Sequence, residues 1–144
     1  MRIVNLISKF LPTQIAYAHC DVPCGIYDPK PAQIAAATVL KMVEKIIDLD
    51  KKNEMTVDVM NSMVRMIWTK EEHARKCKEE ILVLWTDYFK PEHLEKFPDL
   101  HETFWKTAKL CSENKQHLSL ESAQELVKAV DHIADIFQQS NAPK

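Results

Sequence analysis

Apolar residues recur at three- and four-residue steps along most of the chain after Pro31, which is the spacing of one face of an α-helix. The first stripe predicts a helix over residues 31–49, with Pro31 in its first turn. The second starts after Asn53 and ends before Pro91, and we expect this long helix to kink near Thr69. The two stripes contain Ile34, Val39, Met42, Val43, Ile46 and Ile47, and then Met60, Met63, Ile67, Ala74, Cys77, Ile81, Leu84 and Trp85.

Two shorter stripes follow and complete a set of four helices. The third begins after Pro98, and residues Ser119 to Ser122 offer an N-terminal cap for the fourth. Their apolar positions are Leu100, Phe104, Ala108 and Cys111, and then Ala123, Leu126, Val127, Val130, Ile133 and Phe137. Four amphipathic helices with short links predict an all-α fold, an antiparallel four-helix bundle over residues 31–144. We assign Trp68, Trp85, Trp105 and the thiols of Cys77 and Cys111 to its core.

Composition removes several classes of protein from consideration. A length of 144 residues with 46% hydrophobic residues fits one domain, and a single glycine argues against β-barrels and phosphate-binding loops. Charged residues break every apolar run well before the roughly 18 residues of a membrane span. With 19 basic and 21 acidic side chains, the chain shows no basic excess that would favour nucleic acid. The scattered His93, His101, His117 and His132 lack the paired spacing of bundle metal sites.

The first 18 residues have the character of a removable leader. They carry Arg2 and Lys9, lack acidic residues, and end in the small-residue pattern Ala16-Tyr17-Ala18. Lys9 and Pro12 interrupt the apolar run that a secretory signal needs, so we expect a cytoplasmic protein, with secretion or a periplasmic location as the alternative. Either way, a protease that removes the leader is an expected partner.

Residues 19–30 form a short segment that concentrates unusual chemistry ahead of the first helix. Its sequence starts His19-Cys20-Asp21-Val22-Pro23-Cys24-Gly25 and places two thiols four positions apart. A small disulfide loop or an unspecific metal-binding tail are the simpler explanations. We call this segment the hook.

Cleavage after Ala18 would turn the hook into a chelate. The free amine of His19, the backbone nitrogen of Cys20 and its thiolate can bind one metal through two adjacent five-membered rings, and Cys24 completes a square plane. The imidazole of His19 reaches the axial position. Square-planar nitrogen and sulfur donors favour nickel(II) or copper(II), and nickel tolerates two thiolates better than copper(II) does. A metal that can gain or lose one electron, and whose axial position is open, can both oxidise and reduce superoxide.

Two segments carry a specific resemblance to a known family. HCDVPCGIYDP resembles the N-terminal metal hook of nickel superoxide dismutases, and WTDYFKPEHLEKFPDLH, residues 85–101, resembles the stretch at the end of that family's second helix. The resemblance implies a four-helix bundle that assembles as a homohexamer, one nickel ion per subunit, and conversion of superoxide to oxygen and hydrogen peroxide by Ni(III)/Ni(II) cycling.

The same resemblance implies roles for individual residues. His19, Cys20 and Cys24 would ligate nickel, Tyr27 would gate the axial face, and Asp21 and Tyr88 would border the substrate channel. Lys90 would attract the anionic substrate at the channel mouth, for which the simpler explanation is a solvated surface lysine. Pro23 matches a family proline with a candidate cis bond, and Gly25 would supply a backbone conformation that larger residues resist.

One departure from the family concerns the support of the axial imidazole. Several members hold it with a glutamate and an arginine, and Ala35 and His73 stand at those positions here. A backbone group, His73, Arg65 or water would have to take over this role. Two rival functions remain at this stage: a non-catalytic nickel or copper carrier, and a disulfide-stabilised bundle without metal.

Overall fold

The fold, described for residues 25–52 and 55–141 by a computed structural model, consists of four long helices. They are α2 (Lys30–Asp50), α3 (Val57–Val83), α4 (Leu100–Gln116) and α5 (Leu120–Ser140). A π-helical turn, η1 (Leu84–Tyr88), and a 3-10 turn, η2 (Pro91–Glu95), connect α3 to α4. The described ranges contain no strand, so the all-α prediction is confirmed.

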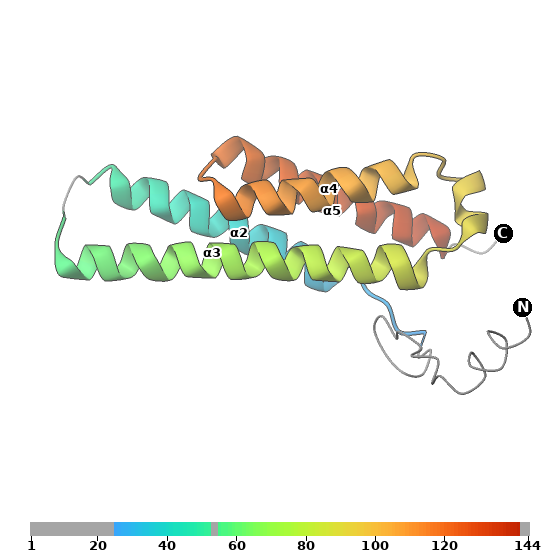
Figure 1. Ribbon diagram of the computed structural model, residues 1–144, viewed down its shortest axis with the longest axis horizontal. Helices are drawn as coiled ribbons and strands as arrows, with labels where there is room; N and C mark the ends of the chain where they lie inside the picture. Colours follow the sequence, from blue (N-terminus) through green and yellow to red (C-terminus); the bar gives the residue numbers. More distant parts are fainter. Residues whose placement is uncertain (1–24, 53–54, 142–144) are drawn as a thin grey trace, which may run out of the picture.

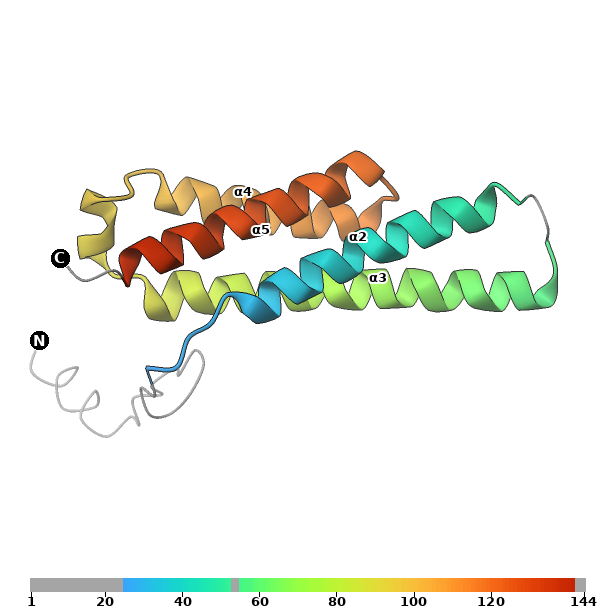
Figure 2. The same ribbon diagram turned by 180° about the vertical axis from the view of Figure 1, so that it is seen from behind.

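The helices are arranged as two hairpins that pack against each other (Figures 1 and 2). Helix α2 packs on α3 and α5, and α4 packs on α3 and α5. The α2–α3 hairpin extends beyond α4 and α5 at one end of the molecule (Figure 1). The opposite end carries the turns η1 and η2 and the end of α5, and residues 25–29 lead into α2 on this side of the molecule (Figure 1). In the described residues, no helix is both long and apolar enough to cross a membrane.

The core follows the predicted stripes closely where all four helices meet. Its fully buried side chains include Val39, Val43, Cys77, Ile81, Leu100, Phe104, Cys111, Leu126, Val130 and Ile133. Helices α3 and α5 begin at hydroxyl caps, where Thr56 accepts a hydrogen bond from the Val59 amide at 3.2 Å and Ser119 from the Ser122 amide at 3.1 Å. The expected cap at Ser119 is therefore confirmed.

Two expectations for α3 and the tryptophans are wrong. Helix α3 contains no proline or glycine and runs straight through Thr69, so the expected kink is absent (Figure 1). Trp85 packs against the core, but Trp68 and Trp105 are 71% and 54% exposed. Trp68 is exposed because it lies on the outer face of α3: it precedes the buried Lys70 by two residues, which places it about 200° away around the helix axis.

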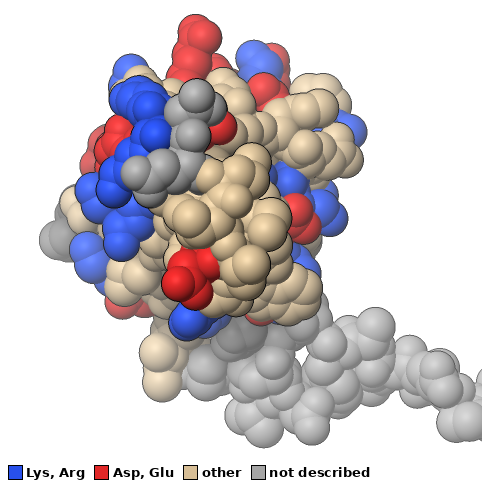
Figure 3. Space-filling view, turned by 90° about the vertical axis from the view of Figure 1, so that its left-hand side faces the viewer, with Lys and Arg blue, Asp and Glu red and all other residues tan. Residues whose placement is uncertain are grey.

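This projecting end leaves apolar side chains in contact with solvent. Val57, Met60, Val64, Ile67 and Trp68 are all exposed along α3. Viewed end-on, this part of the molecule shows a broad uncharged surface beside lysine and arginine side chains (Figure 3). These side chains lie on one side of α3, next to the stripe whose later members Ala74, Cys77 and Ile81 are buried.

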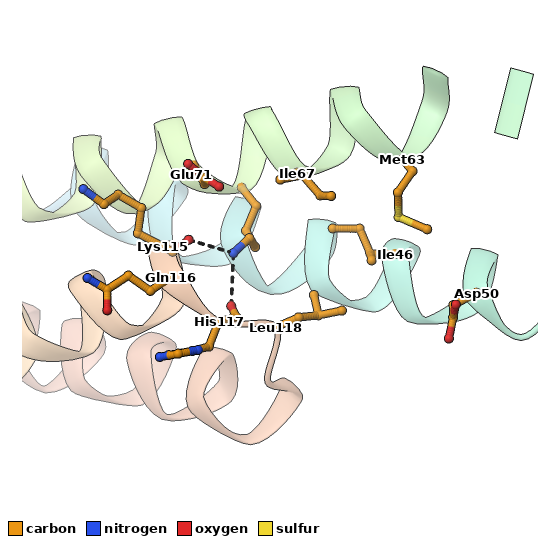
Figure 4. A pocket seen from close by; sticks show the side chains of 10 residues that line it. Ile46, Asp50, Met63, Ile67, Glu71, Lys115, Gln116, His117 and Leu118 are labelled. Atoms are coloured by element: carbon orange, nitrogen blue, oxygen red, sulfur yellow. Dashed lines mark hydrogen bonds between the residues drawn. The ribbon is translucent and has the colours of Figure 1, made fainter. Parts of the chain in front are cut away.

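A buried lysine of α3 forms hydrogen bonds with the end of α4. The ammonium of Lys70, only 4% exposed, donates to the carbonyl oxygens of Asn114 at 2.7 Å, Lys115 at 3.2 Å and His117 at 3.0 Å (Figure 4). These carbonyls lie at the C-terminal end of α4, where unpaired acceptors and the helix dipole favour a cation. Lys70 thus replaces the missing intrahelical partners.

The two core thiols are expected to resist alkylation in the folded protein. Cys77 and Cys111 are free and buried, and their mutual hydrogen bond together with burial raises the pKa of the Cys77 thiol well above its usual range. Because the thiolate is the reactive form, a thiol titration of native nickel-free protein should count two rapid cysteines, and four after denaturation. Rapid labelling of Cys77 in native protein at neutral pH would contradict this assignment.

Candidate metal centre

The hook joins α2 through a short described stretch, residues 25–29. Gly25 has a φ of 69°, a left-handed conformation that side chains with a Cβ adopt only at a cost. The carboxylate of Asp28 accepts a hydrogen bond from the Lys30 amide at 2.8 Å, which fixes the entry of the chain into α2. Pro31 then lies in the first turn, as expected. The expected ligands His19, Cys20 and Cys24, with Asp21 and Pro23, fall outside the described residues.

Tyr27 and Tyr88 lie side by side although 60 residues separate them in the sequence. Their ring centroids are 5.5 Å apart and the rings are inclined by 58°. Tyr88 reaches this place because α3 changes into the π-helical turn η1, in which the Phe89 amide bonds to the Leu84 carbonyl at 3.1 Å. The extra residue in this wider turn redirects the chain at the end of α3.

A cavity of about 440 Å³ opens beside the tyrosine pair. Lys90 borders this cavity and is exposed, so Tyr27, Tyr88 and Lys90, the three expected site residues of the described chain, line one cavity. The other lining residues come from the root of the hook, η1, η2 and the end of α5: Gly25, Asp87, Glu92, His93, Ser140 and Asn141.

Asp87 contributes an unsatisfied acceptor to this cavity. Its Oδ1 accepts a hydrogen bond from the Thr86 hydroxyl at 2.9 Å, whereas its buried Oδ2 has no hydrogen-bond partner among the described residues. Buried carboxylate oxygens are nearly always hydrogen-bonded, so this atom is available to a donor that enters the cavity.

The ring of Tyr88 is held from several sides. It stacks on His93 with centroids 5.8 Å apart and contacts Phe137 of α5 at 4.5 Å. His93 is itself oriented, because its Nδ1 accepts a hydrogen bond from the Lys90 amide at 2.9 Å. The Tyr88 hydroxyl lies 2.7 Å from the Ser140 hydroxyl and 2.9 Å from the Asn141 side-chain oxygen.

The positions expected to support the axial imidazole differ in their hydrogen-bonding groups and in their distance from the cavity. Ala35 is buried in α2 and has no polar side chain. His73 is half-buried on α3, and its Nδ1 lies 2.9 Å from the Thr69 carbonyl. A carbonyl only accepts, so Nδ1 carries the proton and Nε2 of the neutral ring remains an acceptor. Arg65 is exposed and precedes Leu84 by 19 residues, roughly 28 Å along the helix axis, which removes it from the cavity.

The bundle itself offers no metal site in its described part. No group of three or more histidine, cysteine, aspartate or glutamate side chains is placed to hold an ion there. The expectation that the hook holds the metal therefore meets no competing site in this part of the chain.

Comparisons with known proteins agree with this arrangement. The profile of the nickel-containing superoxide dismutase family matches residues 14–141. Superoxide dismutase [Ni] of Streptomyces coelicolor is 39% identical over 127 residues and that of Streptomyces seoulensis 37%, with 88% of each chain covered in both cases. A native nickel superoxide dismutase structure superimposes with a TM-score of 0.74 at 34% identity, covering 86% of this chain and all of the other.

The chain belongs to the nickel-containing superoxide dismutase family. Its cofactor is nickel, and it is an enzyme that converts superoxide to oxygen and hydrogen peroxide.

The structure also adds residues that the sequence did not single out. Asp87 and His93 lie within the 85–101 segment, yet only Tyr88 and Lys90 were selected from it. A buried carboxylate without a partner and a ring stacked on tyrosine become visible only in three dimensions. Ser140 and Asn141 carry no signal in the sequence, because more than 50 residues separate them from Tyr88.

Proposed function

We propose that the mature enzyme begins at His19 and holds nickel through the hook. The ligands are the amine and imidazole of His19, the amide nitrogen and thiolate of Cys20, and the thiolate of Cys24. These donors fit nickel(II) and lower the potential of its one-electron oxidation. Bound nickel supplies the Ni(III)/Ni(II) exchange by which one superoxide ion is oxidised and a second one reduced.

The cavity beside the hook provides what the reaction needs from the protein. Lys90 stands at its border and attracts the superoxide anion, although the chain as a whole is slightly acidic. Tyr27 and Tyr88 narrow the approach to small molecules, and Tyr27 with ordered water delivers protons to the reduced product. Asp21 borders the same channel from the hook. The contact of the two tyrosine rings at 5.5 Å, immediately beside the root of the hook, is the observation that carries these assignments.

We further propose a homohexamer as the functional assembly. The exposed apolar side chains on the projecting half of α3 support association, because monomeric proteins rarely leave a contiguous surface of this kind in water. The hook also favours it, since about a dozen residues must be ordered at a backbone cost of roughly 1–2 kcal/mol each. A neighbouring subunit can share that cost.

The division into a leader (1–18), a hook (19–30) and a bundle (31–144) completes the proposal. A protease removes the leader, and the interrupted apolar run in the leader favours maturation in the cytoplasm.

Native mass spectrometry of the purified enzyme tests these points together. We expect a subunit mass that starts at His19, one nickel per subunit, and six subunits per particle. A nickel-loaded active monomer would contradict the hexamer, and an active chain with a different first residue would contradict the chelate.

His73 provides a narrower test of imidazole support. If its Nε2 accepts a hydrogen bond from the His19 imidazole, directly or through water, His73→Ala should lower turnover about ten-fold, as outer partners of metal ligands commonly do. The spectrum of nickel(III) should change with it. Lys76→Ala, an exposed change on the same helix, serves as the control. An unchanged rate and spectrum in His73→Ala would assign the support to another group.

A further inference from the structure

The hydroxyl of Tyr88 is bound by the last turn of α5 rather than by groups of the hook's root. Its two partners, Ser140 and Asn141, close α5 and also line the cavity. The ring of Tyr88 rests on Phe137 of the same turn, with centroids 4.5 Å apart. The ring and the hydroxyl of Tyr88 are thus both held by the final residues of α5.

The direction of these hydrogen bonds follows from counting donors. The Ser140 hydroxyl donates to the Phe137 carbonyl at 2.7 Å, so towards Tyr88 it accepts. The Asn141 side-chain oxygen only accepts, and it lies 2.9 Å from the Tyr88 oxygen. The single phenolic proton of Tyr88 is therefore directed to α5, where the two acceptors share it.

This pathway cannot carry a proton onward. The chain of donors runs from Tyr88 to Ser140 and ends on the backbone carbonyl of Phe137, which has no proton to pass. A role for this network in proton delivery is therefore excluded, and what it can do is fix the position and orientation of the phenol.

We propose that Ser140 and Asn141 are positioning residues that hold Tyr88 against Tyr27 and thereby keep the approach to the hook narrow. This inference rests on the channel role proposed for Tyr88. It makes the C-terminal turn of α5 part of the active-site wall, although the turn lies 52 residues beyond Tyr88 in the chain.

A double-mutant cycle on the nickel-loaded mature enzyme tests the proposal. Ser140→Ala combined with Asn141→Leu should lower the rate about five-fold per occupied nickel, because the phenolic proton then loses both of its acceptors. In a Tyr88→Phe background the same pair of changes should have no further effect. Ser140→Thr keeps the hydroxyl and should restore part of the rate when it replaces Ser140→Ala. Gln138→Ala, an exposed change in the same turn, is the matched control.

A second measurement is independent of nickel and of activity. The full chain contains three tyrosines, so its ring carbons give three NMR signals that Tyr→Phe variants assign. The Tyr88 signal should shift in Ser140→Ala/Asn141→Leu and stay in place in Gln138→Ala. An unmoved Tyr88 signal, or additive effects in the Tyr88→Phe background, would overturn the positioning role. If Tyr88→Phe alone leaves the rate unchanged, the proposed channel role of Tyr88 fails instead.

Discussion

A chain that retains residues 1–18 is expected to show no dismutase activity, even with nickel in excess. In that precursor the nitrogen of His19 is an amide joined to Ala18, so it cannot serve as an amine ligand. The first five-membered ring of the chelate does not close, and the imidazole loses the partner that brings it to the axial position. Superoxide consumption by the intact precursor, compared with protein cleaved after Ala18, measures the effect.

The comparison has a built-in control, because cleavage of the same preparation should restore activity. A variant in which the junction is blocked against cleavage should remain inactive when nickel is added. Equal rates for the intact and the cleaved protein would refute the role of the His19 amine.

Loss of either hook thiolate should abolish turnover. Cys20→Ser and Cys24→Ser replace a soft thiolate by a hydroxyl that remains protonated at neutral pH and binds nickel poorly. We expect activity to fall below detection in both variants, together with loss of bound nickel by elemental analysis. The buried Cys77 and Cys111 provide matched controls, since Cys77→Ala and Cys111→Ala should cost stability but keep nickel.

Thermal unfolding distinguishes the loss of nickel in the hook variants from the loss of stability in the core variants. The hook variants should unfold near the midpoint of nickel-free native protein, because their cores are unchanged, whereas the core variants should unfold at lower temperature. Substantial turnover in Cys20→Ser or Cys24→Ser would place the metal elsewhere.

The bundle was predictable because helix periodicity reports which residues face a neighbour. The expected first helix, 31–49, agrees closely with Lys30–Asp50, and the cap at Ser119 follows from local chemistry. Met63 shows the limit of this reasoning. Its spacing fits the stripe, but it is only half-buried, because burial depends on how far α4 and α5 extend, which no local pattern contains.

The candidate site was predictable to a different degree. The ligand set is a prediction from the spacing of His19, Cys20 and Cys24, where chelate ring size decides what can bind, and these residues lie outside the described part of the chain. Tyr27 and Tyr88 came from the family resemblance, and the structure places their rings together. The contacts of Ser140 and Asn141 depend on where α5 ends in space relative to η1, so sequence alone could not indicate them.

The π-helical turn Leu84–Tyr88 makes the direction of Tyr88 independent of the rotational phase of α3, which a regular helix would couple to each other. Core packing fixes the rotational phase of α3 through Ala74, Cys77 and Ile81, while the one residue added in η1 sets where Tyr88 is aimed. Removing that residue would let α3 continue with regular geometry and would turn everything beyond it by roughly 100° about the helix axis. The core contacts of α3 up to Ile81 would keep their phase, whereas Tyr88 and the core residue Phe89 would both be redirected. Loss of the one residue added in η1 would therefore disrupt the aromatic wall of the cavity, although the helical part of α3 before it would keep its packing.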